Sequence, residues 1–323
     1  MSDRATPDRQ VHTPHPRAHL AGTLRAIAHT LGLVGGALPA DVRALLDRPA
    51  DLPPTVPPEA AALKYDLYLT AASTRAWGLT VNDTWEPAAF RAALDRFLGP
   101  RAAPIARLSA ALGHVPATTC GLGFDAPGRP PRVKVYLKEA RWGAGLTDTP
   151  TLRTLAAAQL GIDVPPWLGD RTLGVVAVEL HPDGATGLKL YPGGDTAAAA
   201  AAGAPGAAPL VHTLARTSPG PGHYYLTVRL GPDAPPRVAM NKVYNVVQTA
   251  FTGRGADVEG VWSEVGRLFE SAGQGGVLQS LRDRLTIPGL RVVPTATAVE
   301  DEGRSVDVYV AAWATEPGSD PRP

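Results

Sequence analysis

The chain has 323 residues, with 31 Lys and Arg against 30 Asp and Glu, a formal net charge of +1 and 44% hydrophobic residues. This near-neutral balance excludes a global field that would attract nucleic acid or an anionic membrane, and we expect neither as a partner. The length exceeds that of a usual domain, but closed β-barrels often reach it as one unit. A single cysteine, Cys120, excludes an internal disulfide framework and fits a reducing cytosol, so we expect a cytoplasmic protein.

The two ends of the chain lack the patterns of folded elements. Residues 1–17 are rich in Pro, His, Arg and Asp and contain no apolar segment, so we expect a disordered tail and not a secretory signal. Residues 316–323 are expected to form a second tail, and no stretch of the chain is apolar enough to predict a membrane span. One folded domain is therefore expected over residues 18–315.

Between these ends, helical stretches alternate with β-hairpins, each of which is two alternating or apolar runs around a turn. In the first half we expect helices at residues 17–33, 39–46, 86–98 and 103–112, and hairpins at residues 62–70 with 74–82 and 118–124 with 132–138. In the second half we expect helices at residues 149–160, 196–216, 258–272 and 276–285, and hairpins at residues 173–181 with 187–192, 223–230 with 237–246 and 291–298 with 305–313. Local residues support this division, because Pro182-Asp183-Gly184 favours a turn and Gly161 favours a helix end.

The repeated unit is helix–helix–strand–strand, about five times over, which predicts an α+β fold with ten antiparallel strands. Closing such a sheet removes the exposed edges that invite aggregation, and helices can then cover its outside. We therefore predict a closed ten-stranded antiparallel β-barrel surrounded by helices. An open α+β sheet, or two sheets, are the alternatives.

A charged residue and an aromatic residue two positions later recur in the second strand of each hairpin. The pairs are Arg75 and Trp77, Lys134 and Tyr136, Lys189 and Tyr191, Lys242 and Tyr244, and Asp307 and Tyr309. Because side chains alternate along a strand, both members of a pair point to the same face. The strand positions of opposite parity are mostly apolar, as at Val135, Leu137 and Leu190, and are expected to meet the helices. The charged and aromatic side chains are therefore expected to line the interior.

An interior lined by Lys, Arg and Tyr calls for a ligand of matching chemistry. A buried cation requires an anion or it loses its proton, and a diphosphate supplies the negative charge. Tyrosine ring faces stabilise a cation, and their bulk excludes water. An allyl diphosphate that ionises to a carbocation needs both groups in one place. A single Lys-x-Tyr pair would instead suggest a solvated surface, so it is the repetition that favours the interior.

At these strands the chain resembles the ABBA-type aromatic prenyltransferases, whose PT barrel is built from five helix–helix–strand–strand units. Arg132-Val-Lys134-Val-Tyr136-Leu137 and Gly187-Leu-Lys189-Leu-Tyr191 are similar to the Arg-x-Lys-x-Tyr and Lys-x-Tyr strands of the indole branch, the dimethylallyltryptophan synthase-like enzymes. The resemblance covers nearly the whole chain after about residue 18. It implies that the diphosphate is bound by Arg75, Lys134, Lys189, Lys242 and, from its place on the fourth hairpin, Arg229. It implies that the allyl cation is shielded by Tyr136, Tyr191, Tyr225, Tyr244 and Tyr309.

Two positions depart from the pattern of that branch. Gly187 stands where the family has a leading Arg, so one cationic contact is missing or replaced. Lys64 stands near the glutamate that receives the indole N–H in the tryptophan-type enzymes, which argues against free tryptophan as the acceptor. Asp66 and Glu179 are the carboxylates expected to point inward. Each is a candidate either for the catalytic base that binds or deprotonates the acceptor, or for a counter-ion of an interior lysine.

The reaction that these residues imply is transfer of a dimethylallyl or geranyl group from its diphosphate to a carbon of an electron-rich aromatic acceptor. Acceptors of the indole, carbazole or phenol type, as in secondary metabolism, are expected as the second small-molecule partner of a monomer or weak homodimer. The sequence has no Asp-Asp-x-x-Asp segment, with which Mg²⁺-dependent prenyltransferases bind diphosphate, so no cofactor and no obligatory metal are expected. A non-catalytic barrel that carries an apolar or aromatic anion, and a barrel enzyme for another phosphorylated substrate, are the alternatives.

Overall fold

The computed structural model describes residues 65–70, 77–81, 99–112, 117–124, 132–138, 146–181, 183–192, 204–220, 222–232, 234–244, 257–286, 290–300 and 303–314. In residues 65–70, 77–81 and 117–124 it describes the backbone alone. The predicted tails, the helices predicted at residues 17–33, 39–46 and 86–98, and Arg75 lie outside the described residues.

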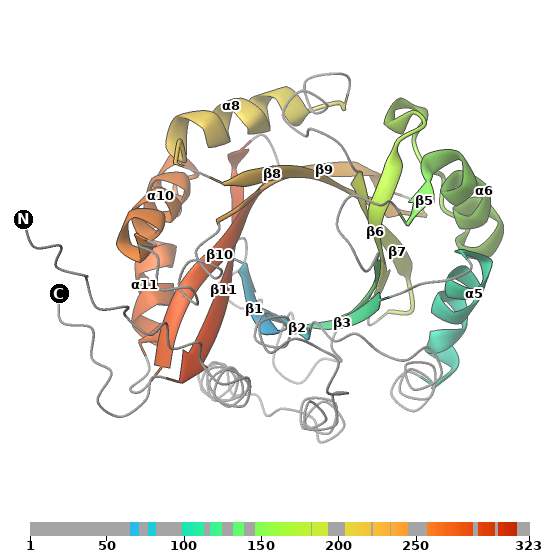
Figure 1. Ribbon diagram of the computed structural model, residues 1–323, viewed down its shortest axis with the longest axis horizontal. Coiled ribbons are helices and arrows are strands. Elements are labelled where there is room, and N and C mark those ends of the chain that lie inside the picture. The colour runs from blue at the N-terminus through green and yellow to red at the C-terminus, as the bar shows by residue number, and fades with distance from the viewer. Residues whose placement is uncertain are drawn as a thin grey trace, which may run out of the picture.

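The strands form one strongly curled antiparallel sheet (Figure 1). They are β1 (Tyr65–Thr70), β2 (Trp77–Val81), β3 (Ala117–Phe124), β4 (Arg132–Lys138), β5 (Thr147–Asp148), β6 (Thr172–Leu180), β7 (Thr186–Pro192), β8 (His223–Gly231), β9 (Ala234–Val243), β10 (Leu290–Glu300) and β11 (Ser305–Ala314). The order across the sheet is β4-β3-β2-β1-β11-β10-β9-β8-β7-β6-β5. A further antiparallel pairing joins β4 to β6, with Cα partners that run from Val133 and Leu180 to Lys138 and Val175.

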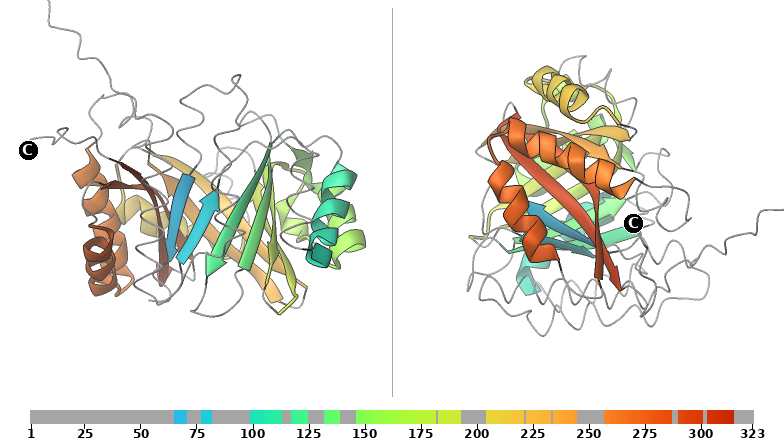
Figure 2. Two further views of the ribbon diagram at one scale, coloured as in Figure 1. Left: turned by 90° about the horizontal axis from the view of Figure 1, so that it is seen from below. Right: turned by 90° about the vertical axis from the view of Figure 1, so that its left-hand side faces the viewer.

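The described helices lie on the outer side of the curled sheet (Figures 1 and 2). They are the short 3-10 helices η2 (Gly99–Ala102) and η3 (Pro166–Leu168), and the α-helices α5 (Ala103–Leu112), α6 (Thr149–Leu160), α8 (Ala207–Thr217), α10 (Val258–Ser271) and α11 (Gly275–Leu285). Local residues set the ends of α6: Asp148 accepts a hydrogen bond from the Thr151 backbone N–H at 2.6 Å, and Gly161 ends the helix with φ 66°. Within the described part of the chain, no helix has the length and apolar character that crossing a membrane requires.

The apolar core lies between the sheet and these helices. Alternate strand residues, such as Val135, Leu190 and Val308, are fully buried and belong to one cluster with helix residues such as Leu108 and Leu268. Burial of each such side chain contributes roughly 1.5–3 kcal/mol, which makes this layer the main source of stability. The prediction that the apolar strand positions meet the helices is confirmed. The intervening positions therefore lie on the inner face of the sheet.

The elements agree closely with the sequence prediction. Ten strands lie within three residues of their predicted bounds, and α5, α6, α10 and α11 within one residue. The described sheet has an eleventh strand, β5, whose two residues pair with the start of β6 and are too few to show any alternation in sequence. A helical stretch is predicted from residue 196, whereas α8 begins at Ala207 and residues 193–203 lie outside the described part.

Candidate active site

The inner face of the sheet brings together basic side chains from three strands. Lys134 on β4, Lys189 on β7 and Arg229 on β8 alternate with buried apolar residues of the same strands. Lys189 lies opposite Arg229 across β7 and β8, and Lys134 lies opposite Glu179 across β4 and β6. Lys134, Glu179 and Lys189 are only 8%, 4% and 2% exposed, so little water reaches their charges. We call Lys134, Lys189 and Arg229 the inner basic cluster.

Two carboxylates balance part of the charge of the inner basic cluster. Glu179 Oε1 lies 2.8 Å from Lys134 Nζ and 3.7 Å from Arg229 Nε. Glu300 Oε1, at the end of β10, lies 3.1 Å from Arg229 Nη1. Of the three basic groups, Lys134 and Arg229 thus have carboxylate contacts among the described residues. A ligand with several negative oxygens would complete the balance.

Lys189 is the member of the cluster whose protonation is most affected by its surroundings. Burial is the largest cause that lowers its pKa well below 10.5, and the positive charges of Arg229 and Lys134 lower the pKa further. Glu179 and Glu300 act in the opposite direction, with smaller effect. In the free protein this amine therefore gives up its proton much more readily than a lysine in water. An anion bound beside it would favour the protonated form.

Three tyrosines adjoin the inner basic cluster on the same face. The ring centroids of Tyr136 and Tyr191 are 6.3 Å apart, and the rings of Tyr191 and Tyr225 are stacked with centroids 5.9 Å apart. Lys189 Nζ lies 5.3 Å from the centroid of the Tyr191 ring. Burial, above all, raises the pKa of Tyr191 well above 10, so its phenol stays neutral. This tyrosine row, Tyr136, Tyr191 and Tyr225, presents uncharged ring faces beside the cations.

Tyr309 faces the interior from a different part of the sheet. It lies on β11, where its neighbours Val308 and Val310 belong to the apolar core that meets the helices. Its Cα partners are Tyr68 on β1 and Ala296 on β10. By alternation, the half-buried Tyr309 shares the inner face with the tyrosine row.

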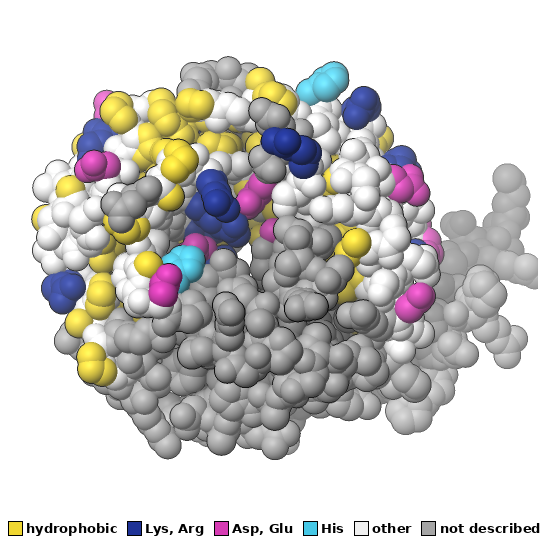
Figure 3. Space-filling model, turned by 180° about the vertical axis from the view of Figure 1, so that it is seen from behind, with side chains coloured by type: hydrophobic (Ala, Val, Ile, Leu, Met, Phe, Trp, Pro, Cys, Tyr) yellow, Lys and Arg dark blue, Asp and Glu magenta, His cyan; other side chains and the backbone are white. Residues whose placement is uncertain are grey.

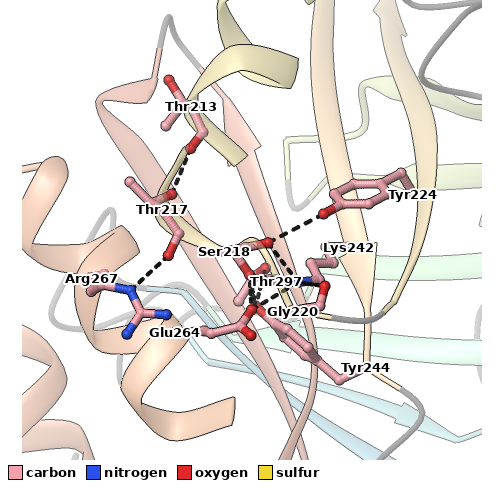
Figure 4. A network of polar contacts seen from close by, with 10 residues as sticks. All are labelled: Thr213, Thr217, Ser218, Gly220, Tyr224, Lys242, Tyr244, Glu264, Arg267 and Thr297. Atoms are coloured by element: carbon pink, nitrogen blue, oxygen red, sulfur yellow. Dashed lines mark hydrogen bonds and ion pairs between the residues drawn. The ribbon is translucent and has the colours of Figure 1, made fainter. Parts of the chain in front are cut away.

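Lys242 and Tyr244 lie on the outer face of the sheet, which corrects the prediction that they line the interior (Figure 4). Lys242 Nζ lies 2.8 Å from Glu264 Oε2 on α10 and donates to the carbonyl oxygens of Ser218 at 2.7 Å and Gly220 at 2.8 Å. The hydroxyl groups of Tyr244 and Ser218 are hydrogen-bonded at 3.2 Å. These partners come from the layer between sheet and helices, so the predicted roles of Lys242 in diphosphate binding and of Tyr244 in the shield are wrong.

The reason for this correction is the alternation of side chains along β9. Met240 shares a face with Lys242 and Tyr244 and is fully buried in the apolar core, whereas Asn241 is opposite Tyr225 and points inward. The Lys-x-Tyr spacing is the same as in β4 and β7, so the pair alone does not reveal its face. The apolar side chain two positions before Lys242 is the sequence feature that distinguishes β9.

Of the predicted carboxylates, the structure describes the side chain of Glu179 and not that of Asp66. Arg75 lies outside the described residues, and Asp66 is described by its backbone alone, which is paired opposite Thr80. Glu179 lies on the inner face, and its contacts with two cations make it a counter-ion in the free protein. Glu300 was missed because the sequence predicts a turn there, and only the register of β10 shows that it lies near Arg229.

The molecular surface is hollowed on one face. Seen from behind, basic and acidic side chains gather at a hollow in the middle of the molecule (Figure 3). Among the residues that the structure describes, no group of three or more His, Cys, Asp or Glu side chains is placed to hold a metal ion. The inner basic cluster is suited by its charge to a multiply charged anion.

Comparisons with known proteins relate this chain to others through structure. No protein-family model and no curated protein matches its sequence. The 6-dimethylallyltryptophan synthase from Micromonospora olivasterospora, solved in complex with DMASPP and Trp, matches with a TM-score of 0.64 and 17% identity over 93% of this chain and 97% of that chain. The 5-dimethylallyltryptophan synthase from Streptomyces coelicolor matches with a TM-score of 0.60 and 18% identity over 92% of this chain and 97% of that chain. AnaPT from Neosartorya fischeri matches with a TM-score of 0.62 and 11% identity over 95% of this chain and 97% of that chain. Over nearly its whole length the chain therefore resembles the ABBA-type aromatic prenyltransferases in its fold.

Proposed function

We propose that this protein is an aromatic prenyltransferase that moves a dimethylallyl group from its diphosphate to a carbon of an electron-rich aromatic acceptor. The observation that carries the proposal is that the inner basic cluster and the tyrosine row share one face of the sheet, with Lys189 beside the Tyr191 ring. The likeness in fold to two dimethylallyltryptophan synthases supports the same class of reaction. The complex of one of them with DMASPP and Trp supports a dimethylallyl donor and an aromatic acceptor here.

The inner basic cluster binds the diphosphate of the donor. Each charge-assisted contact from Lys134, Lys189 or Arg229 contributes roughly 1.5–3 kcal/mol. When the carbon–oxygen bond of the allyl group breaks, the leaving diphosphate takes the bonding electron pair, and these charges stabilise it. We assign Arg75 as a further diphosphate ligand.

The tyrosine row stabilises the allyl cation that this step leaves behind. The interaction of a cation with a desolvated ring face stabilises the cation by about 2 kcal/mol. The Tyr191 phenol stays neutral because burial raises its pKa, and the bulk of the three rings keeps water from capturing the cation. Tyr309, on the inner face of β11, completes the shield.

The aromatic acceptor then attacks the cation. A carbon–carbon bond forms, and the ring carbon loses its proton to restore aromaticity. We propose Asp66 as the base, because Glu179 is held by Lys134 and Arg229 as a counter-ion of the inner basic cluster. Indoles, carbazoles and phenols are the acceptor types, since their rings are electron-rich.

The architecture proposed for this reaction is a closed ten-stranded barrel within a single domain over residues 18–315. The pairing of β4 with β6 supports closure, because it joins strands that would otherwise be near opposite ends of the sheet. A closed interior limits the access of water to the cation. Because lysine and arginine charges bind the diphosphate, the proposal requires no metal ion.

A turnover assay tests this function. The protein is incubated with dimethylallyl or geranyl diphosphate and a panel of indoles, carbazoles, naphthols and phenols, with and without EDTA. We expect one diphosphate released for each C-prenylated product, at a rate that EDTA does not change. Donor binding without any turnover would identify a carrier, and diphosphate release without a prenylated product would identify a different enzyme. Either result contradicts the proposal.

A further inference from the structure

Asn241 is a buried polar residue on the inner face of β9 to which the reaction above gives no role. Its Cα partners are Tyr225 on β8 and Ala298 on β10. Its neighbour Met240 belongs to the outer apolar core, so the Asn241 side chain points to the interior. The side chain is 0% exposed, which means that bulk water does not satisfy its amide group.

The orientation of the Asn241 amide follows from its hydrogen bonds. Nδ2 donates to the backbone oxygens of Tyr225 at 3.3 Å and Ala239 at 3.5 Å, and to Thr227 Oγ1 at 3.2 Å. A carbonyl oxygen can only accept, so the nitrogen and not the oxygen of the amide must face these two groups. The amide oxygen therefore faces away from them.

That oxygen has no hydrogen-bond partner in the described part of the structure. Asn241 Oδ1 is buried and is without a donor among the residues described, although its amide nitrogen has three acceptors. Buried polar atoms nearly always have a partner, so an orphaned acceptor on an inner face points to a donor that a ligand brings.

The surroundings of Asn241 suit an aromatic ring better than a diphosphate. Ala239, Ala296 and Ala298, on the same face of β9 and β10, are small and apolar and offer no charge or side-chain donor to a diphosphate. Tyr225, the cross-strand partner of Asn241, is at the end of the tyrosine row. Tyr225 and Arg229 are separated by about 13 Å along β8. A diphosphate also needs donors, whereas Oδ1 can only accept.

We propose that Asn241 Oδ1 accepts a hydrogen bond from the N–H or O–H group of the aromatic acceptor and thereby selects substrates that carry one. This inference rests on the proposed function and defines its substrate class further: indoles, carbazoles and phenols with a free donor, and not their N- or O-methylated forms. Asn241 is thus a specificity-determining residue that contacts the acceptor and not the donor.

The test compares matched substrates, indole with 1-methylindole and a naphthol with its methyl ether. The wild-type protein is expected to prefer the free N–H or O–H by roughly 10-fold to 100-fold in kcat/KM, because the methylated form leaves Oδ1 unpaired. Asn241→Leu is expected to reduce this preference to within about 3-fold, mainly through slower turnover of the donor-bearing substrates. Thr227→Val is the control, because it removes an acceptor of Nδ2 but leaves Oδ1 in place, and it should keep the preference.

The outcomes separate this inference from the proposed function. If the wild-type protein prenylates neither form of any substrate, the proposed function fails and the inference fails with it. If the wild-type protein turns over both the free and the methylated substrates and Asn241→Leu retains the full preference, Asn241 does not bind the N–H or O–H group. Only the inference is then overturned. If Asn241→Leu does not fold, the inference is tested instead by a crystal structure of the wild-type protein with dimethylallyl thiolodiphosphate and indole, which shows the hydrogen-bond partner of Oδ1. An indole nitrogen within hydrogen-bond distance of Oδ1 supports the inference, and a water or protein donor at that position overturns it.

Discussion

The surroundings of Lys189 prepare its amine to bind an anion. The residue is 2% exposed, and its cross-strand partner is Arg229. Burial and the positive charges of Arg229 and Lys134 therefore oppose protonation of its amine. The pKa of Lys189 is therefore well below 10.5 in the free protein. A bound diphosphate would reverse the sign of the local charge and raise this pKa again.

The first prediction concerns proton uptake when the donor binds. The pKa of Lys189 is low in the free protein and should be higher in the complex. At a pH between these two pKa values, binding of dimethylallyl thiolodiphosphate should therefore be accompanied by uptake of a proton. The affinity should accordingly fall as pH rises through that window, by up to about 10-fold per pH unit. Calorimetry in buffers with different ionisation enthalpies measures the uptake, and Lys189→Met is the control because it has no amine to titrate. Equal uptake by the variant and the wild-type protein would contradict the assignment to Lys189.

At the scale of elements, a second buried lysine ties β9 to the helices. Lys242 Nζ contacts Glu264 on α10 and the Ser218 carbonyl that follows α8, and Ser218 Oγ also donates to Glu264 (Figure 4). Burial lowers the pKa of Lys242, while the hydrogen bond and charge of Glu264 act to raise it. The ion pair therefore keeps a cation in the layer between sheet and helices, where it supports the fold and not the reaction.

The second prediction is that this pair matters for stability. Glu264→Ala leaves the Lys242 ammonium buried without its counter-charge and should lower the free energy of unfolding by about 3–5 kcal/mol. The double variant Lys242→Met with Glu264→Leu should recover most of that loss, because no unpaired charge remains. Urea denaturation gives both values.

A matched control is available on the same helix. Glu259 on α10 pairs with Arg282 at 3.3 Å, but its side chain is 78% exposed, so Glu259→Ala should change the free energy of unfolding by less than about 1 kcal/mol. If Glu264→Ala were as mild as Glu259→Ala, the buried pair would not have the role given to it.

The elements were predictable because their sequences carry local patterns. Alternation and turn residues define the hairpins, and the Lys-x-Tyr pairs of β4 and β7 were correctly assigned to one face because apolar residues flank them. Two features depend on contacts that local sequence does not contain. The face of Lys242 is decided by Met240 and by a partner on α10, and the approach of Glu300 to Arg229 depends on the register across β8, β9 and β10.

At the scale of the whole molecule, the curled sheet divides two kinds of buried lysine. Lys189 is on the inner face near other cations, and Lys242 is on the outer face with a carboxylate at 2.8 Å. Both are at most 2% exposed, so burial alone does not distinguish a binding residue from a structural one. The difference lies in the neighbouring charges: Lys242 lies against a carboxylate, whereas the charges of Arg229 and Lys134 oppose protonation of Lys189, and a bound anion would offset them.

The affinity for dimethylallyl thiolodiphosphate in four proteins tests the central claim most directly. Calorimetry would compare the wild-type protein with Lys134→Ala, Lys189→Ala and Lys242→Met at a temperature where all are folded. Loss of one charge-assisted contact should weaken binding by about 10-fold to 150-fold for each of the two inner lysines. Lys242→Met should stay within about 3-fold of the wild-type value, because its side chain lies beyond the sheet. Unchanged binding in the first two variants, or an equal loss in Lys242→Met, would contradict the claim that the inner face holds the diphosphate.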